Sequence, residues 1–214
     1  MIKPTIELEL ALLKKYQTVI AIDEVGRGPW AGPLVFGLIK LEQDFITNKE
    51  QQELLTQVRD SKMLSPKKRQ ELAVKIQQIF WGRIISLDNH EIDKRGVQAA
   101  QRQGVAKIVA ELGSSQTFFL LDLMRGVSLE VPHQMVVKGD SKHAGISAAS
   151  IIAKVYRDNW MIDLHQKDPR YGFDQHKGYG TKLHQERLAE HGPSIWHRAS
   201  FRPIARLFKG QKIV

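Results

Sequence analysis

Apolar positions along the chain form two kinds of pattern: short β-branched runs and longer stretches with helical spacing. The run TFFLLD is apolar up to its last residue, which is typical of a strand covered on both faces. Turn residues bound this run and four others that are rich in β-branched or aromatic residues. The runs predict strands at 17–23, 34–41, 81–88, 117–122 and 135–138.

The longer stretches carry start signals and apolar faces of helices. Ser65 and Pro66 suit the N-cap and first position of a helix, and Leu72, Ile76 and Ile79 follow on one face. Similar patterns predict helices at 66–80, 97–112, 144–165 and 181–190. Because strands come early and then alternate with helices, the order predicts a mixed α/β sheet with helices on both faces.

The N-terminal stretch predicts a short amphipathic helix rather than a secretory signal, because Glu7 and Glu9 interrupt its apolar residues. No apolar run approaches the ~20 residues that a membrane span needs. The chain has no cysteine, which excludes a disulfide framework and a thiolate metal site. We therefore expect a single cytoplasmic domain with no membrane partner.

Charge narrows the choice of partner. The formal net charge is +9 over 214 residues, which favours a polyanionic ligand. The distribution adds to this, because no acid follows Glu190 while basic residues continue to the end of the chain. These residues are Arg198, Arg202, Arg206, Lys209 and Lys212. Such a one-signed tail favours a nucleic-acid contact surface.

Four acids stand where apolar strands end or turns begin. Asp23 and Glu24 close the first strand, Asp122 closes TFFLLD, and Asp140 lies in VKGDSK after the last short strand. A single acid at such a place is usually a turn residue or a helix cap. This explanation is weaker for the four acids together, because functional sites in open α/β sheets form beyond the carboxyl ends of neighbouring strands. We expect Asp23 and Asp122 to meet there if their strands are adjacent.

Carboxylates brought together repel one another unless a cation joins them. Oxygen ligands without cysteine favour Mg²⁺ or Mn²⁺, and the eight histidines show no HExxH spacing for zinc. Two such ions are a standard device for in-line attack on a phosphodiester. Acids, metal and a basic chain together indicate a nuclease or another phosphoryl-transfer enzyme.

The segment GRGPWAG follows the first two acids directly. Asp23 and Glu24 would point to opposite faces of a regular strand, so we expect the strand to lose regularity between them, as Gly26 and Gly28 permit. GRGPWA also matches the GxGxxA dinucleotide fingerprint, but two negative charges precede it and Pro33 would break the required helix. We interpret it as a loop whose backbone N–H groups can face a ligand.

At this point the sequence resembles the ribonuclease HII family. IDEVGRGPWAGPLV resembles that family's signature around its first two catalytic acids. The later blocks DSKMLS, LLD, VKGDSK, SAASIIAKVYRD, YGFDQHKGYGTKLH and GPSIWHRASFRP follow in the family's order and cover nearly the whole chain. The Gly-Arg-Gly version favours type HII over the sister type HIII, which remains an alternative.

The resemblance implies a ribonuclease H-like fold: a five-stranded mixed sheet flanked by helices, with a small helical C-terminal part. One catalytic domain would span 1–214, and about 170–214 would form a basic part that contacts substrate. The implied reaction is metal-dependent endonucleolytic cleavage of RNA in RNA–DNA hybrids and 5′ of single ribonucleotides in duplex DNA. It leaves 3′-hydroxyl and 5′-phosphate ends and requires Mn²⁺ or Mg²⁺, and we expect a monomer.

Residue by residue, the resemblance implies that the catalytic, metal-binding acids are Asp23, Glu24, Asp122 and Asp140. It implies that Gly26, Arg27 and Gly28 contact the ribonucleotide and its 2′-hydroxyl, and that Tyr179 packs against the sugar at the RNA–DNA junction. Phosphate contacts are expected for Lys177, His197 and Arg198, although the last two could equally brace the C-terminal segment.

Two positions depart from the family's usual pattern. Leu123 follows the third acid where the family usually has glycine, and could crowd Asp122. Arg95-Gly96 replaces a frequent Asn-Ile pair, and neither change removes a ligand. A non-catalytic nucleic-acid-binding domain is the second hypothesis. It is less favoured because acids inside a basic face repel phosphate, whereas a nuclease needs them to bind metal.

Overall fold

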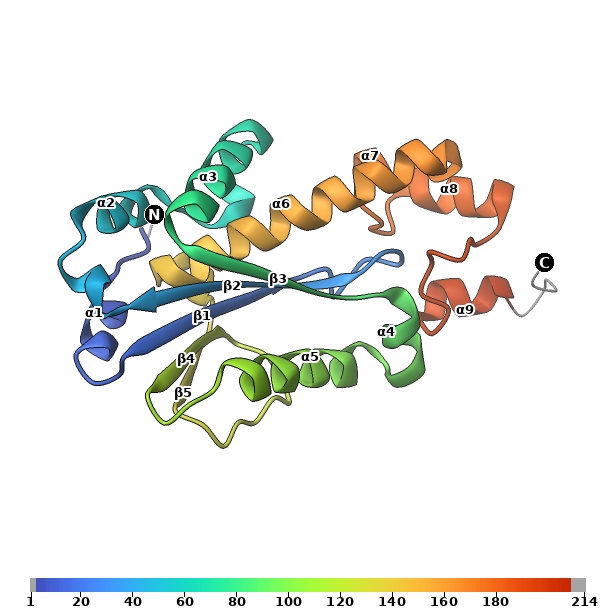
Figure 1. Cartoon of the computed structure of the whole chain (residues 1–214). Helices are drawn as coiled ribbons and strands as arrows, with labels where there is room; N and C mark the ends of the chain where they lie inside the picture. The colour runs from blue at the N-terminus through green and yellow to red at the C-terminus, as the bar shows by residue number, and fades with distance from the viewer. Residues whose placement is uncertain (1–2, 209–214) are drawn as a thin grey trace.

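The sheet of this computed structural model has five strands, as the sequence predicts, and the structure describes residues 3–208 (Figure 1). The spatial order is β3-β2-β1-β4-β5, with β1 antiparallel to β2 and parallel to β4. The strands are β1 Thr18–Val25, β2 Leu34–Glu42, β3 Trp81–Leu87, β4 Thr117–Asp122 and β5 His133–Val136. The last strand begins and ends two residues earlier than predicted, because Lys138 adopts a left-handed conformation and starts a turn.

The helices include the short N-terminal helix and the four longer ones that the sequence predicts, together with several short ones that it did not. Ser65 caps α3 as expected, since its side chain accepts from the N–H of Lys68. Gly96, with φ 78°, separates α4 from α5, so the Arg95-Gly96 departure marks a helix break. The helices are α1 Glu7–Leu13, α2 Lys49–Gln57, α3 Pro66–Ile79, α4 Asn89–Arg95, α5 Val97–Leu112, α6 Ala144–Lys167, α7 Phe173–His176, α8 Lys182–His191 and α9 Arg202–Phe208.

The two faces of the sheet are covered by different helices. On β1, Val19 and Ala21 belong to a core cluster that includes buried residues of α6, whereas Ile20 and Ile22 belong to a second cluster with α5. Figure 1 shows α6 crossing one face of the sheet and α5 lying against the other. This alternation along β1 decides which face each residue after Ile22 must point to.

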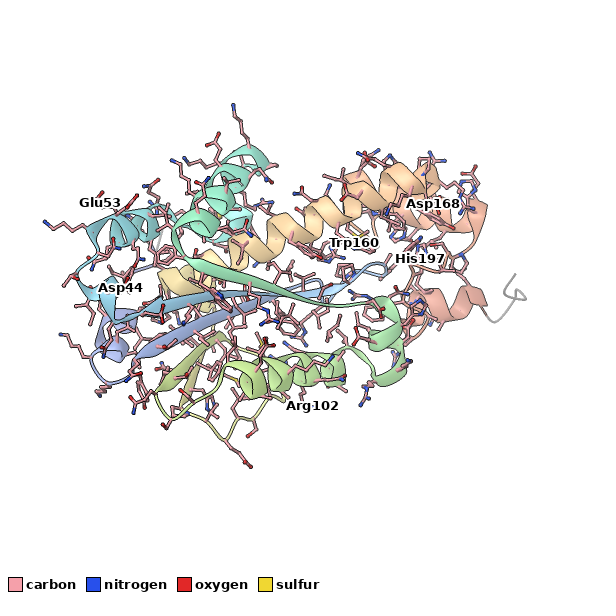
Figure 2. All side chains as sticks on the ribbon, in the orientation of Figure 1. Asp44, Glu53, Arg102, Trp160, Asp168 and His197 are labelled. Atoms are coloured by element: carbon pink, nitrogen blue, oxygen red, sulfur yellow. The ribbon has the colours of Figure 1, made fainter. Side chains whose placement is uncertain are left out.

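The C-terminal part packs on the second half of α6, which extends past the end of the sheet (Figure 1). A third apolar cluster joins Met161 and Leu164 of α6 to α7, α8 and α9. Figure 2 shows His197 between α8 and α9, and its side chain is only 2% exposed. Within residues 3–208, no helix is long and apolar enough to cross a membrane. Lys209 and Lys212 of the basic tail lie outside the described residues.

Candidate active site

The four acids that the sequence singles out lie around one cavity of about 330 Å³. The parallel pairing of β1 with β4 ends at Ile22 and Leu121, and Asp23 and Asp122 follow directly. Asp140 comes from the short 3₁₀ turn Gly139–Ser141 after β5. The cavity is lined by Asp23, Glu24, Val25, Ser61, Lys62, Asp122, Asp140, Ser150, Lys154 and Tyr179.

The expected loss of strand regularity between Asp23 and Glu24 does not occur. The antiparallel ladder with β2 continues without a bulge through Asp23, Glu24 and Val25. Alternation therefore holds, and Glu24 Oε1 accepts from Gln101 of α5, while Asp23 lies beside Ser150 of α6. Both acids reach the cavity because β4 no longer pairs with β1 beyond Ile22, so this edge of β1 is open.

Burial and mutual repulsion raise the pKa values of acids in this cluster. Burial raises the pKa of Asp23 well above its ordinary value, and the neighbouring Glu24 raises it further. Burial also raises the pKa of Glu24 to about 7, although the Arg27 guanidinium opposes this. The pKa of Asp140 is raised by burial against the opposing charge of Lys62. A cation placed among these acids would stabilise their charged forms and so lower all three pKa values.

The donor set fits a divalent metal. Four carboxylates supply hard oxygen ligands, and Glu24 Oε2 is buried without a hydrogen-bond partner. Asp122 is held in place, since its Oδ1 accepts from the N–H of Gly139 at 2.7 Å. Across the described residues no three acids or histidines lie close enough together to hold a metal ion as they are placed, and the four carboxylates instead line the walls of the cavity. Carboxylate oxygens are the ligand type that hard divalent ions such as Mg²⁺ and Mn²⁺ prefer.

Sequence reasoning missed two lysines in the cavity wall. Lys62 Nζ lies 3.5 Å from Asp140 Oδ2, and Lys154 Nζ lies 2.7 Å from Asp158 Oδ1. Lys62 belongs to the DSKMLS block that carries part of the family resemblance, and this block was the sequence feature that could have identified it. Lys154 stands four residues after Ser150 on α6, which places both on the same helix face.

The glycine-rich loop and Tyr179 meet at the cavity. The Tyr179 side chain is 43% exposed, as expected for an aromatic residue between two glycines, and it lines the cavity. A Cβ added at Gly28 would lie 3.8 Å from Tyr179 Cε1, so the loop and the ring are neighbours. Arg27 Nη1 lies 3.9 Å from Glu24 Oε1. The structure thus brings together the acids and the residues expected to contact the ribonucleotide.

Two expected phosphate contacts are wrong. Arg198 is fully buried and His197 nearly so, and neither side chain is available to a phosphate on the surface. Arg198 donates to the carbonyls of Gly26, Arg27 and Gly32. Their buried contacts favour the alternative that they have a bracing role, and for Arg198 these contacts join the C-terminal segment to the glycine-rich segment after β1. Lys177 is half-buried and donates to the carbonyl of Asp174, and its contact with phosphate remains a prediction.

A buried chain of histidines holds the Tyr179 segment. His197 Nε2 lies 3.0 Å from His184 Nε2, and His184 Nδ1 lies 3.0 Å from the carbonyl of Tyr179. Because the N–H of Ser194 donates to His197 Nδ1, the proton of His197 must be on Nε2. Burial lowers the pKa of His184 to about 4 and that of His197 to about 3, so both are neutral near pH 7.

The Leu123 departure does not crowd the site. Its side chain is 40% exposed and is not among the residues that line the cavity. Its N–H donates to the carbonyl of Val136, which extends the parallel alignment of β4 with β5 by one residue. Asp122 therefore keeps its place beside Gly139 despite the larger neighbour.

Comparison with known proteins identifies the family of this chain. The family model for ribonuclease HII matches residues 20–204. A ribonuclease HII of Roseiflexus castenholzii is 41% identical over 94% of this chain and 89% of its own. The crystal structure of ribonuclease H2 from Pyrococcus horikoshii OT3 has a TM-score of 0.73 at 25% identity, covering 90% of this chain and 98% of that one. Bst-RNase HIII in complex with Mn²⁺ shares the fold, with a TM-score of 0.66 at 16% identity over 92% of this chain and 72% of that one. The chain therefore belongs to the ribonuclease HII family and is a nuclease of the ribonuclease H class.

Proposed function

We propose that this endoribonuclease uses divalent metal to cleave the RNA strand of RNA–DNA hybrids and to cut 5′ of single ribonucleotides embedded in duplex DNA. The products would carry 3′-hydroxyl and 5′-phosphate ends. The observation that carries the proposal is the single cavity lined by four carboxylates and by Tyr179, with the Gly28 backbone beside the tyrosine ring. Chemistry and sugar recognition would therefore take place within one cavity.

Asp23, Glu24, Asp122 and Asp140 would hold Mg²⁺ or Mn²⁺. When bound, two such ions supply an activated water nucleophile and stabilise the leaving oxygen of a phosphodiester. The raised pKa values of Asp23, Glu24 and Asp140 support this assignment, because burial and neighbouring acids disfavour their charged forms and a bound cation would oppose both causes. The Mn²⁺ in the structure of Bst-RNase HIII agrees with a divalent ion on this fold.

The chain's own residues would orient the substrate. Tyr179 would cover the sugar from one side, while the backbone of Gly26, Arg27 and Gly28 approaches it closely from the other. Lys62 adds positive charge to the cavity wall, which offsets the repulsion between the carboxylates and an incoming phosphate. All these residues come from one chain, so we propose a single catalytic domain that acts as a monomer.

Cleavage of a duplex carrying one ribonucleotide, with and without Mn²⁺, tests the proposal directly. We expect cleavage only with metal, and only on the 5′ side of the ribonucleotide. Asp122→Asn keeps the shape but removes a negative ligand, so it should lose several orders of magnitude in rate while binding the duplex. Asp163→Asn is the matched control, since Asp163 is exposed on α6 away from the cavity. Substantial cleavage by Asp122→Asn at saturating Mg²⁺ would contradict the assignment.

A further inference from the structure

Arg198 is a buried cation that binds backbone carbonyls instead of an acid. Its side chain is 0% exposed, and no carboxylate of the described residues lies within ion-pair distance of it. Its Nη2 donates to the carbonyl of Gly26 at 2.6 Å, its Nη1 to that of Arg27 at 3.2 Å and its Nε to that of Gly32 at 3.0 Å. One guanidinium thus gathers carbonyls from both ends of residues 26–33, which we call the glycine loop.

Arg157 of α6 is a second buried cation that donates to backbone carbonyls of the glycine loop. It is also 0% exposed, and it donates to the carbonyls of Ala31, Pro33 and Lys177, each at 3.0 Å. Burial lowers the pKa of Arg157 to about 10 and that of Arg198 to about 9, so both remain cations at neutral pH. Two unpaired buried cations are costly, and a lysine could not span several carbonyls as the planar guanidinium does.

The orientation of these carbonyls fixes the direction of the amides that follow. The peptide bonds of the described residues are all trans, and in a planar trans peptide the C=O and the next N–H point in opposite directions. The carbonyls of Gly26 and Arg27 point to Arg198, so the N–H groups of Arg27 and Gly28 point away from it. Neither N–H donates a hydrogen bond to any part of the chain that the structure describes.

These two free donors stand beside the cavity. The Arg27 side chain approaches Glu24, and Gly28 lies against the Tyr179 ring. We propose that Arg198, supported by Arg157, is a positioning residue that aims the consecutive N–H groups of Arg27 and Gly28 at an oxygen of the bound sugar. The inference rests on the proposed function, since the sugar belongs to that substrate. Preorganised donors cost no reordering when the ligand arrives, which is why a fixed loop discriminates better than a mobile one.

Binding to two duplexes that differ by one 2′-hydroxyl tests the positioning role. The affinity of the full chain for each is measured by fluorescence anisotropy with Ca²⁺ in place of Mg²⁺, which separates binding from cleavage. Arg198→Lys keeps the charge but loses the planar guanidinium that bonds several carbonyls at once. We therefore expect the preference for the ribonucleotide duplex to fall at least several-fold. Affinity for the all-DNA duplex should stay within about twofold, because a buried residue contributes no phosphate contact.

Arg69→Lys is the matched control. Arg69 is also nearly buried and also donates to two carbonyls, those of Ser61 and Leu64, but it lies outside the glycine loop. It should lower the melting temperature without changing the preference between the duplexes. An unchanged preference in Arg198→Lys, or an equal loss in Arg69→Lys, would overturn the inference and leave Arg198 a residue of general stability.

A second measurement needs no variant and can overturn the inference even if Arg198→Lys does not fold, because it tests the two N–H groups on which the positioning role depends. Amide hydrogen exchange of the unmutated chain should be fast at Arg27 and Gly28, and should slow on binding the ribonucleotide duplex but not the all-DNA duplex. Equal protection by both duplexes, or by neither, would overturn the inference. Absence of metal-dependent cleavage by the unmutated chain would instead refute the proposed function, so the two failures are distinguishable.

Discussion

Glu9 offers a test of how burial of a single carboxylate sets the stability of this fold. It lies on α1 with 0% exposure, and its Oε1 accepts from the N–H of Gly145 in the first turn of α6 at 2.8 Å. Its Oε2 has no hydrogen-bond partner. Burial raises the pKa of Glu9 from 4.5 to about 7, although the Gly145 bond opposes this. The amphipathic helix expected at the N-terminus therefore places one of its two acids inward.

Glu9→Gln keeps the acceptor for Gly145 and removes the charge. Between pH 4.5 and about pH 7 the folded wild-type protein holds a proton on Glu9 that the unfolded chain has released. Its stability therefore falls as the pH rises through this window, and the Gln variant lacks this loss. The interval from 4.5 to about 7, at about 1.4 kcal/mol per pH unit, amounts to about 3 kcal/mol.

Denaturant unfolding at pH 5 and pH 8 in EDTA measures the effect. The free energy of unfolding of the wild type minus that of Glu9→Gln should fall by about 2 kcal/mol or slightly more between the two pH values, because part of the loss has already occurred at pH 5. Taking this difference cancels the titration of every group that does not contact Glu9. Glu7→Gln is the control, since Glu7 is exposed on the same helix and should give parallel profiles. Parallel profiles for Glu9→Gln as well would refute the reasoning.

Three further predictions concern the surface that meets the substrate. Gly26→Ala should lose several kcal/mol of stability in thermal unfolding, because Gly26 has φ 96° and a Cβ would lie 2.5 Å from the Pro33 carbonyl oxygen. Gly28→Ala should instead melt like the wild type yet cleave poorly, and equal melting temperatures for the two variants would contradict this. Tyr179→Ala should reduce cleavage at a single embedded ribonucleotide more than cleavage of a long RNA–DNA hybrid, and equal reduction of both would return Tyr179 to a packing role. Neutralising the exposed Arg202 or Arg206 should lower the salt slope of duplex affinity by about one unit, and an unchanged slope would remove the residue from the interface.

Local signals in the sequence determined the elements that carry the acids. Alternating and continuous apolar runs placed the strands to within two residues, and a Ser-Pro start placed α3. Asp122 could be recognised because a charge at the end of TFFLLD has no local reason to be there. The sequence did not predict short helices that are stabilised mainly by polar residues. One example is α4, which depends on the reciprocal capping of Asp88 and Glu91, a pattern that resembles an ordinary turn in the sequence.

Only the tertiary structure decided which charged residues face inward. Arg198 and Arg202 belong to the same basic tail, yet one is fully buried and the other exposed. Composition cannot distinguish them, because burial of Arg198 depends on the carbonyl of Gly26, 172 positions away along the chain. The same holds for Asp23 and Glu24. Their alternation is a local property of the strand, but their meeting in one cavity depends on where a partner strand, β4, stops pairing.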